Sequence, residues 1–307
     1  MAIAGDTAAT ARSEAGAVLV AVGLMIFAGL TSSMLHLGVR YVSPQLPAIE
    51  TVCLRSIITL LVTLPFILAT GNAAWRSNNL GLQVLRGCVG VSSMAMWYYA
   101  LGQMPLADAG ALSFTTGIFV TLGAALWFRE RVGARRWSAV IVGLIGATIV
   151  LRPGQGAVSW AAIIAVVSSA LWAASLLIAK ELAKFDSVLT ITFYQPLMIV
   201  PLAALGMLPV WVTPSLEVWL MLAAMGLVAA IGNYCYIMAL KMADASVVMP
   251  ADYVRLVWMV TWGYLLFAEI PGAATWIGSG LIIGATFFIT VREQQLARAR
   301  RATAAKT

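Results

Sequence analysis

One segment of this 307-residue chain occurs twice, and this repeat constrains the fold more than any other feature. Residues 100–137 and 239–276 align without a gap at a constant offset of 139 positions. Each copy has a short polar hinge, a long apolar stretch, a Glu, a Gly and a Trp, and then more apolar residues. A repeat of this length predicts two related halves. Identical pairs include Ala100/Ala239, Leu101/Leu240, Leu126/Leu265, Phe128/Phe267, Glu130/Glu269, Gly133/Gly272, Ala134/Ala273 and Trp137/Trp276.

The composition requires lipid as the solvent for both halves. Hydrophobic residues make up 62% of the chain and charged residues only 10%, and the mean hydropathy is +0.94. A soluble domain has roughly 25% charged residues. A helix needs about 20 apolar residues to cross a bilayer. We therefore expect an all-α membrane protein with ten transmembrane helices, at 17–39, 47–69, 81–102, 106–128, 134–151, 157–180, 187–209, 215–239, 246–268 and 272–291.

The distribution of basic residues predicts the orientation of these spans. Lys and Arg accumulate on the cytoplasmic side of membrane proteins. If the N-terminus is cytoplasmic, the outer loops contain only Arg40 and Arg152, and Arg55 and Arg255 lie within spans. The remaining Lys and Arg of the 19 then lie on the inner side, so both termini are predicted to be cytoplasmic. The basic tail after span ten is expected to bind anionic lipid headgroups rather than a nucleic acid.

The number of spans in each half predicts that the repeats are inverted. Five spans are an odd number, so the second half must enter the membrane from the opposite face. The hinge at Glu130 is rich in Arg, whereas the equivalent hinge at Glu269 has none, in agreement with opposite sides. Inverted repeats around a central site are typical of transporters. The expected organisation is an N-terminal segment (1–16), a first repeat (17–151), a second, inverted repeat (152–291) and a basic tail (292–307).

Asp252 and Arg255 are the most prominent polar residues within a predicted span. They lie three residues apart, so they can pair on one helix face. Intramembrane charge is costly and usually functional. The pair would suit a zwitterionic substrate such as an amino acid, whose ends each meet an opposite charge. The alternative is a self-neutralised structural pair.

Aromatic residues are expected to line the same cavity. Trp97 and Tyr236 occupy equivalent repeat positions, and Trp172 shares a helix face with serines. We include these three with Tyr99 and Tyr253 as candidate substrate-binding residues. The alternatives are a headgroup belt of aromatics for the residues near span ends and helix–helix packing for the face around Trp172.

His36 and Arg55 are further candidates with mainly structural alternatives. His36 is the only histidine, and its position predicts either a place at the outer mouth of a cavity, possible gating included, or a hydrogen-bonded interfacial role. Arg55 lies inside an apolar span, so it should face protein or water. We expect Arg55 to be a structural pin between spans rather than a ligand contact.

Two glycines of the last span suggest close helix packing. Gly280 and Gly284 have the small-xxx-small spacing that lets helices approach closely. The partner would be another helix of the chain or a second copy of it.

Motifs for catalysis and for metal or cofactor binding are absent from the sequence. There is a single histidine, and no G-x-S-x-G, H-E-x-x-H or Walker sequence occurs. The three cysteines are isolated within predicted spans and form no C-x-x-C motif. The sequence therefore predicts neither an enzyme nor a protein with a bound metal or cofactor.

The repeated hinges resemble those of a known family, the EamA family of the drug/metabolite transporter superfamily. The resemblance rests on the motifs LADAGALSF, LWFRERVGARRW and GLIGATIVLRPG, and in the second copy on FAEIPGAATW and GLIIGAT. It implies two inverted five-helix repeats in the bacterial inner membrane. Within the family the chain looks most like amino-acid exporters, which implies a broad, largely apolar cavity lined by spans one, three, four, six, eight and nine.

The expected function is therefore secondary transport. We expect export of neutral or aromatic amino acids and related small metabolites by alternating access through an aromatic-lined cavity. The alternatives are transport of another metabolite or drug, such as a nucleoside-type or cationic compound, and a channel.

Overall fold

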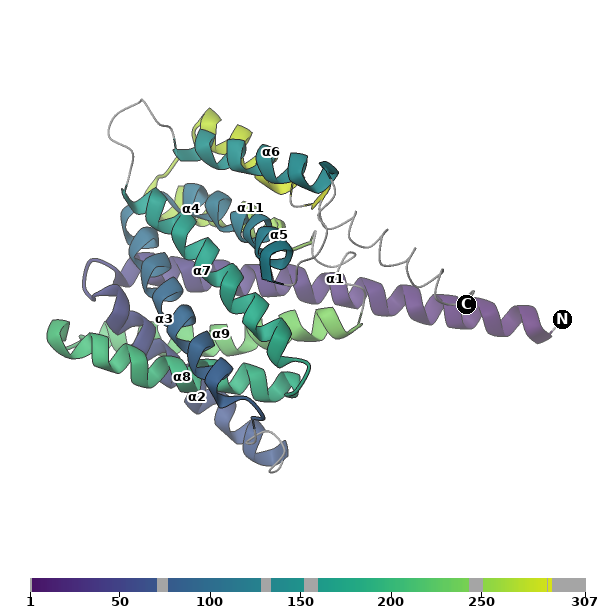
Figure 1. Cartoon of the computed structure of the whole chain (residues 1–307), viewed down its shortest axis with the longest axis horizontal. Helices are drawn as coiled ribbons and strands as arrows, with labels where there is room; N and C mark the ends of the chain where they lie inside the picture. The colour runs from purple at the N-terminus through teal and green to yellow at the C-terminus, as the bar shows by residue number, and fades with distance from the viewer. Residues whose placement is uncertain are drawn as a thin grey trace.

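The computed structural model describes residues 2–70, 77–127, 134–151, 160–242, 251–285 and 287–288. Regular structure in these residues is helical, which confirms the all-α prediction. An apolar helix, Ala273–Ala285, completes the described chain. The other helices (Figure 1) are α1 (Ala2–Val42), α2 (Ala48–Thr70), α3 (Leu80–Gln103), α4 (Leu106–Ser113), α5 (Thr115–Trp127), α6 (Ala134–Leu151), α7 (Trp160–Leu182), α8 (Val188–Met207), the short 3-10 helix η2 (Leu208–Val210), α9 (Leu216–Met242) and α11 (Val254–Phe267).

Many of these helices are apolar enough to lie in a membrane. Shorter apolar helices cover Leu106–Val120, Val140–Leu151, Val254–Phe267 and Ala273–Ala285. With α3 and the longer helices given next, each of the ten predicted spans overlaps at least one described helix. That all ten cross the bilayer stays a prediction. Five helices are long and apolar enough to cross a membrane, namely Val18–Val42, Ala48–Ala69, Trp160–Leu182, Thr190–Val210 and Leu216–Tyr236.

The two halves pack through equivalent pairs of helices. In chain order, α1, α2 and α3 of the first half correspond to α7, α8 and α9 of the second. Helix α1 packs on α9, and α3 packs on α7 in the same way. The contact of α1 with α11 likewise matches those of α7 with α4 and α5, and α2 packs on its own counterpart α8. This arrangement is what a twofold relation between two repeats produces.

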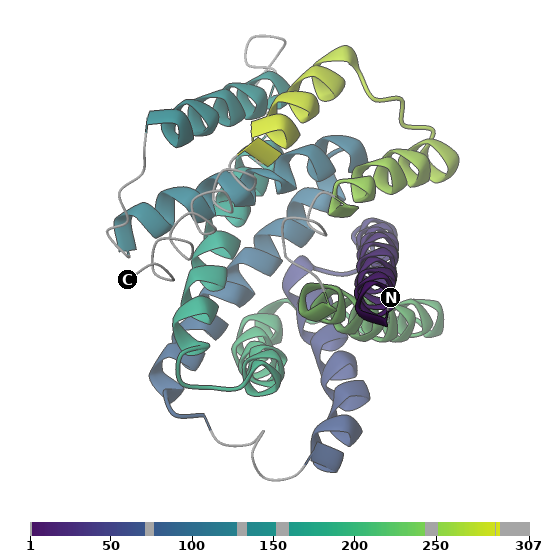
Figure 2. The ribbon, with the colours of Figure 1, turned by 90° about the vertical axis from the view of Figure 1, so that its right-hand side faces the viewer.

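Helix α6 and the helix Ala273–Ala285 lie against each other away from α2 and α8 (Figures 1 and 2). Glycines allow their backbones to approach. A Cβ atom placed on Gly278 would lie 2.6 Å from the carbonyl oxygen of Gly146 and 2.4 Å from the Cγ2 atom of Val150. Gly280 and Gly284, the pair singled out by spacing, have no atom within 4 Å of such a Cβ. The contact therefore uses Gly278 instead.

The fourth predicted span is interrupted, although its sequence suggested one helix over 106–128. Helix α4 ends at Ser113, Phe114 is in a turn, and α5 begins at Thr115. The hydroxyls of Ser113 and Thr115 donate to the carbonyl oxygens of Gly110 and Leu112, at 2.7 and 2.6 Å. Such side-chain bonds compete with the helical backbone bonds.

The ninth predicted span has the same interruption at the equivalent position. Residues 251–252 are helical, Tyr253 is in a turn, and α11 begins at Val254. Phe114 and Tyr253 are 139 positions apart, which is the offset of the sequence repeat. Both have right-handed dihedrals, φ −72° and ψ −12° for Phe114 and φ −64° and ψ −21° for Tyr253. The repeat therefore extends to the helix breaks.

Polar contacts tie the two halves together at one end of the bundle. Arg40 at the end of α1 donates to the carbonyl oxygens of Leu101 and Gly102, and its Nη2 atom lies 3.3 Å from the Oε1 atom of Glu269. The other carboxylate oxygen of Glu269 accepts the Leu106 N–H at 2.8 Å. We call these five residues the Glu269 cluster. The equivalent Glu130 lies outside the described residues.

A second set of polar contacts joins other loops of the two halves. Asp186, between α7 and α8, accepts hydrogen bonds from the Ser77 hydroxyl, the Asn78 backbone and side chain, and the Gln83 amide. We call these four residues the Asp186 cluster. Burial alone would raise the pKa of Asp186, but these hydrogen bonds outweigh it and lower the pKa below its ordinary value.

Candidate functional site

The two helix breaks meet inside the bundle. The rings of Phe114 and Tyr253 are 5.1 Å apart at an interplanar angle of 80°, an edge-to-face contact. Helices α4 and α11 also pack through Gly110, because a Cβ there would lie 2.9 Å from the Met259 sulfur. The equivalent interruptions of the two repeats therefore come together at the interface between the halves.

The predicted pair Asp252 and Arg255 lies at this junction. The Arg255 Nη2 atom is 3.4 Å from the Asp252 carboxylate and 3.4 Å from the Ser113 hydroxyl, to which it donates. The Arg255 guanidinium carbon also lies 5.0 Å from the centre of the Phe114 ring, a cation–π contact. Arg255 of the second repeat thus contacts the helix break of the first repeat.

Helix α1 brings His36 to the same region. The His36 side chain is buried, and its ring makes an edge contact with Trp97 of α3, with centroids 5.6 Å apart. The guanidinium groups of Arg55 and Arg255 are both close enough to interact electrostatically with His36. The structure therefore places His36 beside Trp97 within the bundle, together with two intramembrane charges.

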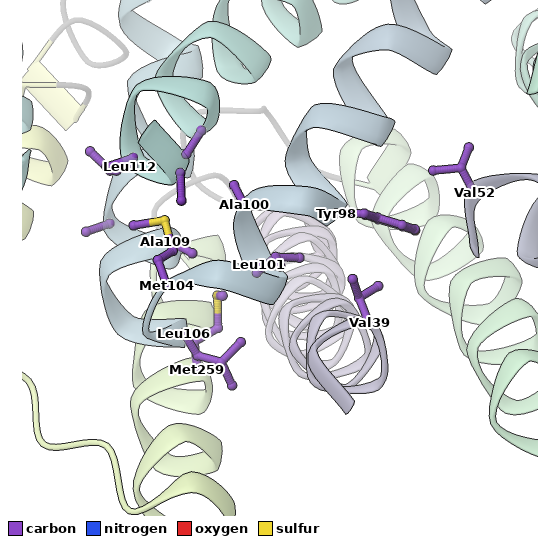
Figure 3. Close-up of a cluster of buried hydrophobic side chains, with 14 of the residues drawn as sticks. Val39, Val52, Tyr98, Ala100, Leu101, Met104, Leu106, Ala109, Leu112 and Met259 are labelled. Atoms are coloured by element: carbon purple, nitrogen blue, oxygen red, sulfur yellow. The ribbon is translucent and has the colours of Figure 1, made fainter. Parts of the chain in front are cut away.

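Arg55 of α2 lies against α3. Its guanidinium carbon is 5.9 Å from the centre of the Tyr98 ring, and its Nη2 atom contacts the Met94 sulfur at 3.9 Å. Tyr98 is only 3% exposed. Figure 3 shows its ring leaving α3 toward the helices that carry Val39 and Val52, which are α1 and α2.

The structure separates the remaining predicted aromatics. Tyr236 is half-buried and close enough to interact electrostatically with Asp252 and Arg255. Trp172 is half-buried on α7. Tyr99, in contrast, is 46% exposed on the surface of the bundle, while its neighbour Tyr98 points inward. Sequence reasoning thus included Tyr99 and left out Tyr98.

Hydroxyl groups of equivalent helices hold α4 and α11 in place. Ser169 of α7 donates to the carbonyl oxygen of Leu112 in α4 at 3.3 Å. On α1, the first-half counterpart of α7, Ser33 accepts from the indole N–H of Trp262 in α11 at 3.1 Å. In each half, a serine of the first helix therefore bonds to an element of the other half's broken span, as a donor in α7 and as an acceptor in α1.

The central residues offer aromatic rings, hydroxyl groups and an ion pair, and they do not resemble a metal centre. Among the described residues, no group of three or more His, Cys, Asp and Glu side chains could hold a metal ion. A separate apolar pocket of about 420 Å³ lies between α1, α9 and the end of α11. It is lined by residues such as Met34, Met221 and Leu266 and contains none of the charged residues above.

Phe114 could have been predicted from the sequence by comparing the two repeats position by position. Phe114 and Tyr253 are both aromatic and are equivalent at the offset of 139. The position of Tyr98 could not be found in this way, because its counterpart at this offset is Ile237. Its inward orientation depends on how α3 is rotated against α1 and α2.

Comparison with known proteins shows close relatives over nearly the whole chain. A riboflavin transporter of Vibrio cholerae is 33% identical over 90% of this chain and 95% of its own length. A pseudopaline exporter of Pseudomonas aeruginosa is 29% identical, covering 85% and 92% of the two chains. An S-adenosylmethionine uptake transporter of Rickettsia bellii is 25% identical, covering 90% and 95%.

A solved structure supports the fold. A protein of known crystal structure superposes with a TM-score of 0.59 at 19% identity, over 93% of this chain and 99% of the other. The model of the EamA-like transporter family matches twice, at residues 15–152 and 159–291, once in each half. The chain is thus a multi-pass protein of the bacterial inner membrane, and the family resemblance seen in the hinges is confirmed. By these two matches, the chain belongs to the EamA-like transporter family.

Proposed function

We propose that this chain is a secondary transporter of a flat aromatic metabolite, with riboflavin as the first candidate, and that it works by alternating access. The single observation that supports this most is the meeting of two equivalent helix breaks at Phe114 and Tyr253, with Asp252 and Arg255 beside them. In transporters, interrupted helices at the interface of repeats commonly form the substrate site. The family membership supports transport as such.

The proposed topology is the one expected from sequence, with ten spans, inverted repeats at 17–151 and 152–291, and cytoplasmic termini. The contacts between loops support it. The Glu269 cluster joins only segments predicted to be at the outer face, and the Asp186 cluster joins only segments predicted to be at the inner face. In alternating access each cluster would have to open in turn.

The chemistry of the centre favours a flat aromatic substrate. Ring faces and edges are offered by five aromatic residues, namely Trp97, Tyr98, Phe114, Tyr236 and Tyr253. A contact between two aromatic rings stabilises a complex by about 0.5–1.5 kcal/mol beyond the effect of the area that it buries. The tricyclic ring of riboflavin would use such surfaces. The V. cholerae riboflavin transporter, similar over almost its whole length, supports the same choice. The proposed site takes Tyr98 in place of Tyr99.

Amino-acid export remains the second candidate, because the Asp252–Arg255 pair would suit the two charges of an amino acid. The relatives leave the direction of transport open, since one is named an exporter and another an uptake transporter. A nucleoside-type substrate is the third candidate.

Counterflow in proteoliposomes tests the proposal. Labelled riboflavin should enter vesicles preloaded with unlabelled riboflavin, and the initial rate should saturate with concentration. Arg255→Ala and Asp252→Ala should each lower the rate about tenfold or more, because each leaves an unpaired charge at the site. The control is Lys184→Ala, which removes an exposed pair with Glu181 of the same i, i+3 spacing and should leave the rate unchanged.

Three results would contradict the proposal in different ways. Counterflow of tryptophan without riboflavin would favour the amino-acid candidate. A riboflavin flux that rises linearly with concentration would indicate a channel. Wild-type rates in both pair variants would remove Asp252 and Arg255 from the site.

A further inference from the structure

The two arginines of the central site differ in how their charge is compensated. Arg255 has the Asp252 carboxylate at 3.4 Å. Arg55 is 7% exposed, and within the described residues its side chain contacts the Ser56 hydroxyl at 3.2 Å, the Met94 sulfur at 3.9 Å and the Tyr98 ring. None of these is an anion. Burying a guanidinium without a partner is costly, so an uncompensated one in a membrane protein points to a ligand.

Two neighbours of Arg55 also have polar atoms without partners. In the part of the chain that the structure describes, the Arg55 Nε, the His36 Nδ1 and the Tyr98 hydroxyl are all buried and make no hydrogen bond. They come from α2, α1 and α3. Arg55 contacts the Tyr98 ring, and His36 contacts the ring of Trp97, the residue before Tyr98, so all three groups lie against the same part of α3. Buried polar groups are nearly always satisfied, so a nearby cluster of three unsatisfied groups is unusual.

These groups share one chemistry. The guanidinium can only donate hydrogen bonds, and the phenol and the imidazole can donate as well. A guanidinium binds two adjacent oxygen acceptors especially well, because its N–H groups form a fixed planar fork. The positive charges of Arg55 and Arg255 near His36 disfavour a cation at this place. The Asp252 carboxylate at the centre is paired with Arg255.

We infer that Arg55, His36 and Tyr98 form a subsite that binds an oxygen-acceptor edge of the substrate. This inference rests on the proposed function and makes it specific. The edge would be a ring carbonyl of a flavin with its neighbouring ring-nitrogen acceptor, or the carboxylate of an amino acid. The aromatic residues around Phe114 and Tyr253 then take the flat or apolar part. Arg55 is thus a ligand-binding residue rather than the structural pin expected from sequence.

Binding to the full-length protein in lipid nanodiscs tests this, with two tricyclic probes measured by equilibrium dialysis. Riboflavin has the carbonyl edge, whereas phenazine has a similar ring system without it. Arg55→Gln should weaken riboflavin binding about 10- to 100-fold, the usual value of hydrogen bonds to a charged group. It should change phenazine binding less than about twofold. Arg55→Lys keeps the charge but loses the fork, so it should weaken riboflavin by an intermediate factor.

Arg86→Lys is the matched control. Arg86 is also a buried arginine, but it donates to the Ile191 carbonyl oxygen at 2.7 Å and to Gln195 at 2.9 Å. Its substitution should leave the ratio of the riboflavin and phenazine affinities unchanged. If Arg55→Gln does not fold, as judged by size-exclusion chromatography, Arg55→Lys decides. An equal effect on both probes, or no effect on riboflavin, would overturn the subsite.

A failure of the proposed substrate gives a different result. If the wild type binds no riboflavin, the proposed function falls, and the subsite is tested with tryptophan and tryptamine, which differ by the carboxylate. Weaker tryptophan binding in Arg55→Gln with unchanged tryptamine binding would keep the subsite. Equal changes for both compounds would refute it.

Discussion

Arg55, Arg86 and Arg255 show how differently one residue type is accommodated inside the same bundle. The Nε atoms of all three make no hydrogen bond among the described residues, so their Nη atoms set them apart. Those of Arg86 bond a backbone carbonyl and a glutamine, that of Arg255 lies beside a carboxylate, and that of Arg55 has no anion or carbonyl oxygen within the described residues. From sequence, Arg86 was counted with the basic residues at the inner face, whereas the structure buries it between α3 and α8. Hydrogen-bond partners therefore separate a structural arginine from a candidate ligand-binding one.

The Asp186 cluster makes a prediction for pH and stability. Asp186→Asn should lower the free energy of unfolding in detergent by about 1–3 kcal/mol at pH 7, because the donors of Ser77, Asn78 and Gln83 lose a charged acceptor. The folded pKa of Asp186 lies below its unfolded value of about 3.9. Its contribution is therefore complete above that pH and is lost as the pH falls through the folded pKa.

Thermal unfolding monitored between pH 7 and pH 3 checks this. The difference between wild type and Asp186→Asn should be constant down to about pH 5 and should shrink below about pH 4. A difference that grows toward low pH would mean that the carboxylate is not the acceptor that stabilises these loops.

At the scale of elements, the two repeats have their helix breaks at equivalent positions. The turns at Phe114 and Tyr253 divide spans that look continuous in sequence, and the serine contacts of α1 and α7 hold the segments beside them. Helix α6 and the helix Ala273–Ala285 contribute none of the central polar residues described above. Their close contact at Gly146 and Gly278 suggests a scaffold.

Gly278 and Gly280 provide a matched test of that contact. Gly278→Ala should destabilise the protein by about 1–3 kcal/mol, because the new methyl group would meet the Gly146 carbonyl oxygen and the backbone of Val150. Gly280→Ala should be neutral or slightly stabilising, since nothing lies within 4 Å of its Cβ and alanine favours a helix. The unfolding temperatures of the two variants, measured in the same detergent, test both expectations. Equal destabilisation by Gly280→Ala would mean that the last helix packs through another face.

At the scale of the whole molecule, contacts between halves hold both ends of the bundle. The Glu269 cluster joins α1, α3 and α4 to the loop after α11. If this is the outer gate, Glu269→Ala should favour opening to the outside, because Arg40 loses its ion pair and the Leu106 N–H its acceptor. Two such contacts at about 1 kcal/mol each correspond to a population shift of at least tenfold.

Cysteine labelling reads out this opening. In a background without Cys53, Cys88 and Cys235, a cysteine introduced at Ser113 should react about ten times faster with an external thiol reagent when Glu269 is replaced by Ala. Glu217→Ala serves as the control, because Glu217 accepts a bond from Tyr41 at the same end but is exposed. The gate assignment fails if both variants raise the labelling equally.

The inverted topology is tested at two equivalent positions. Arg131 and Ile270 are 139 residues apart, each directly after the repeated Glu. In the same cysteine-free background, Ile270→Cys should react with a membrane-impermeant reagent added to intact cells. Arg131→Cys should react only after permeabilisation. Labelling of both from one side would rule out opposed repeats and the alternating access built on them.

The sequence by itself determined the membrane setting, the helical class and the two related halves, because apolar composition and a constant offset are properties of the chain alone. It also made Asp252, Arg255, Tyr253, Trp97 and Tyr236 candidates for the site, since intramembrane charge and repeated aromatic positions are visible without coordinates.

Only the tertiary structure decided which side chains face one another. The break at Phe114, the inward rotation of Tyr98 and the exposure of Tyr99 depend on how neighbouring helices pack, and one residue of helix turn moves a side chain by about 100°. That Arg55 has no anionic partner among the described residues is likewise a property of the assembled bundle. A buried charge is paired or unpaired only once α1, α2 and α3 have come together around it.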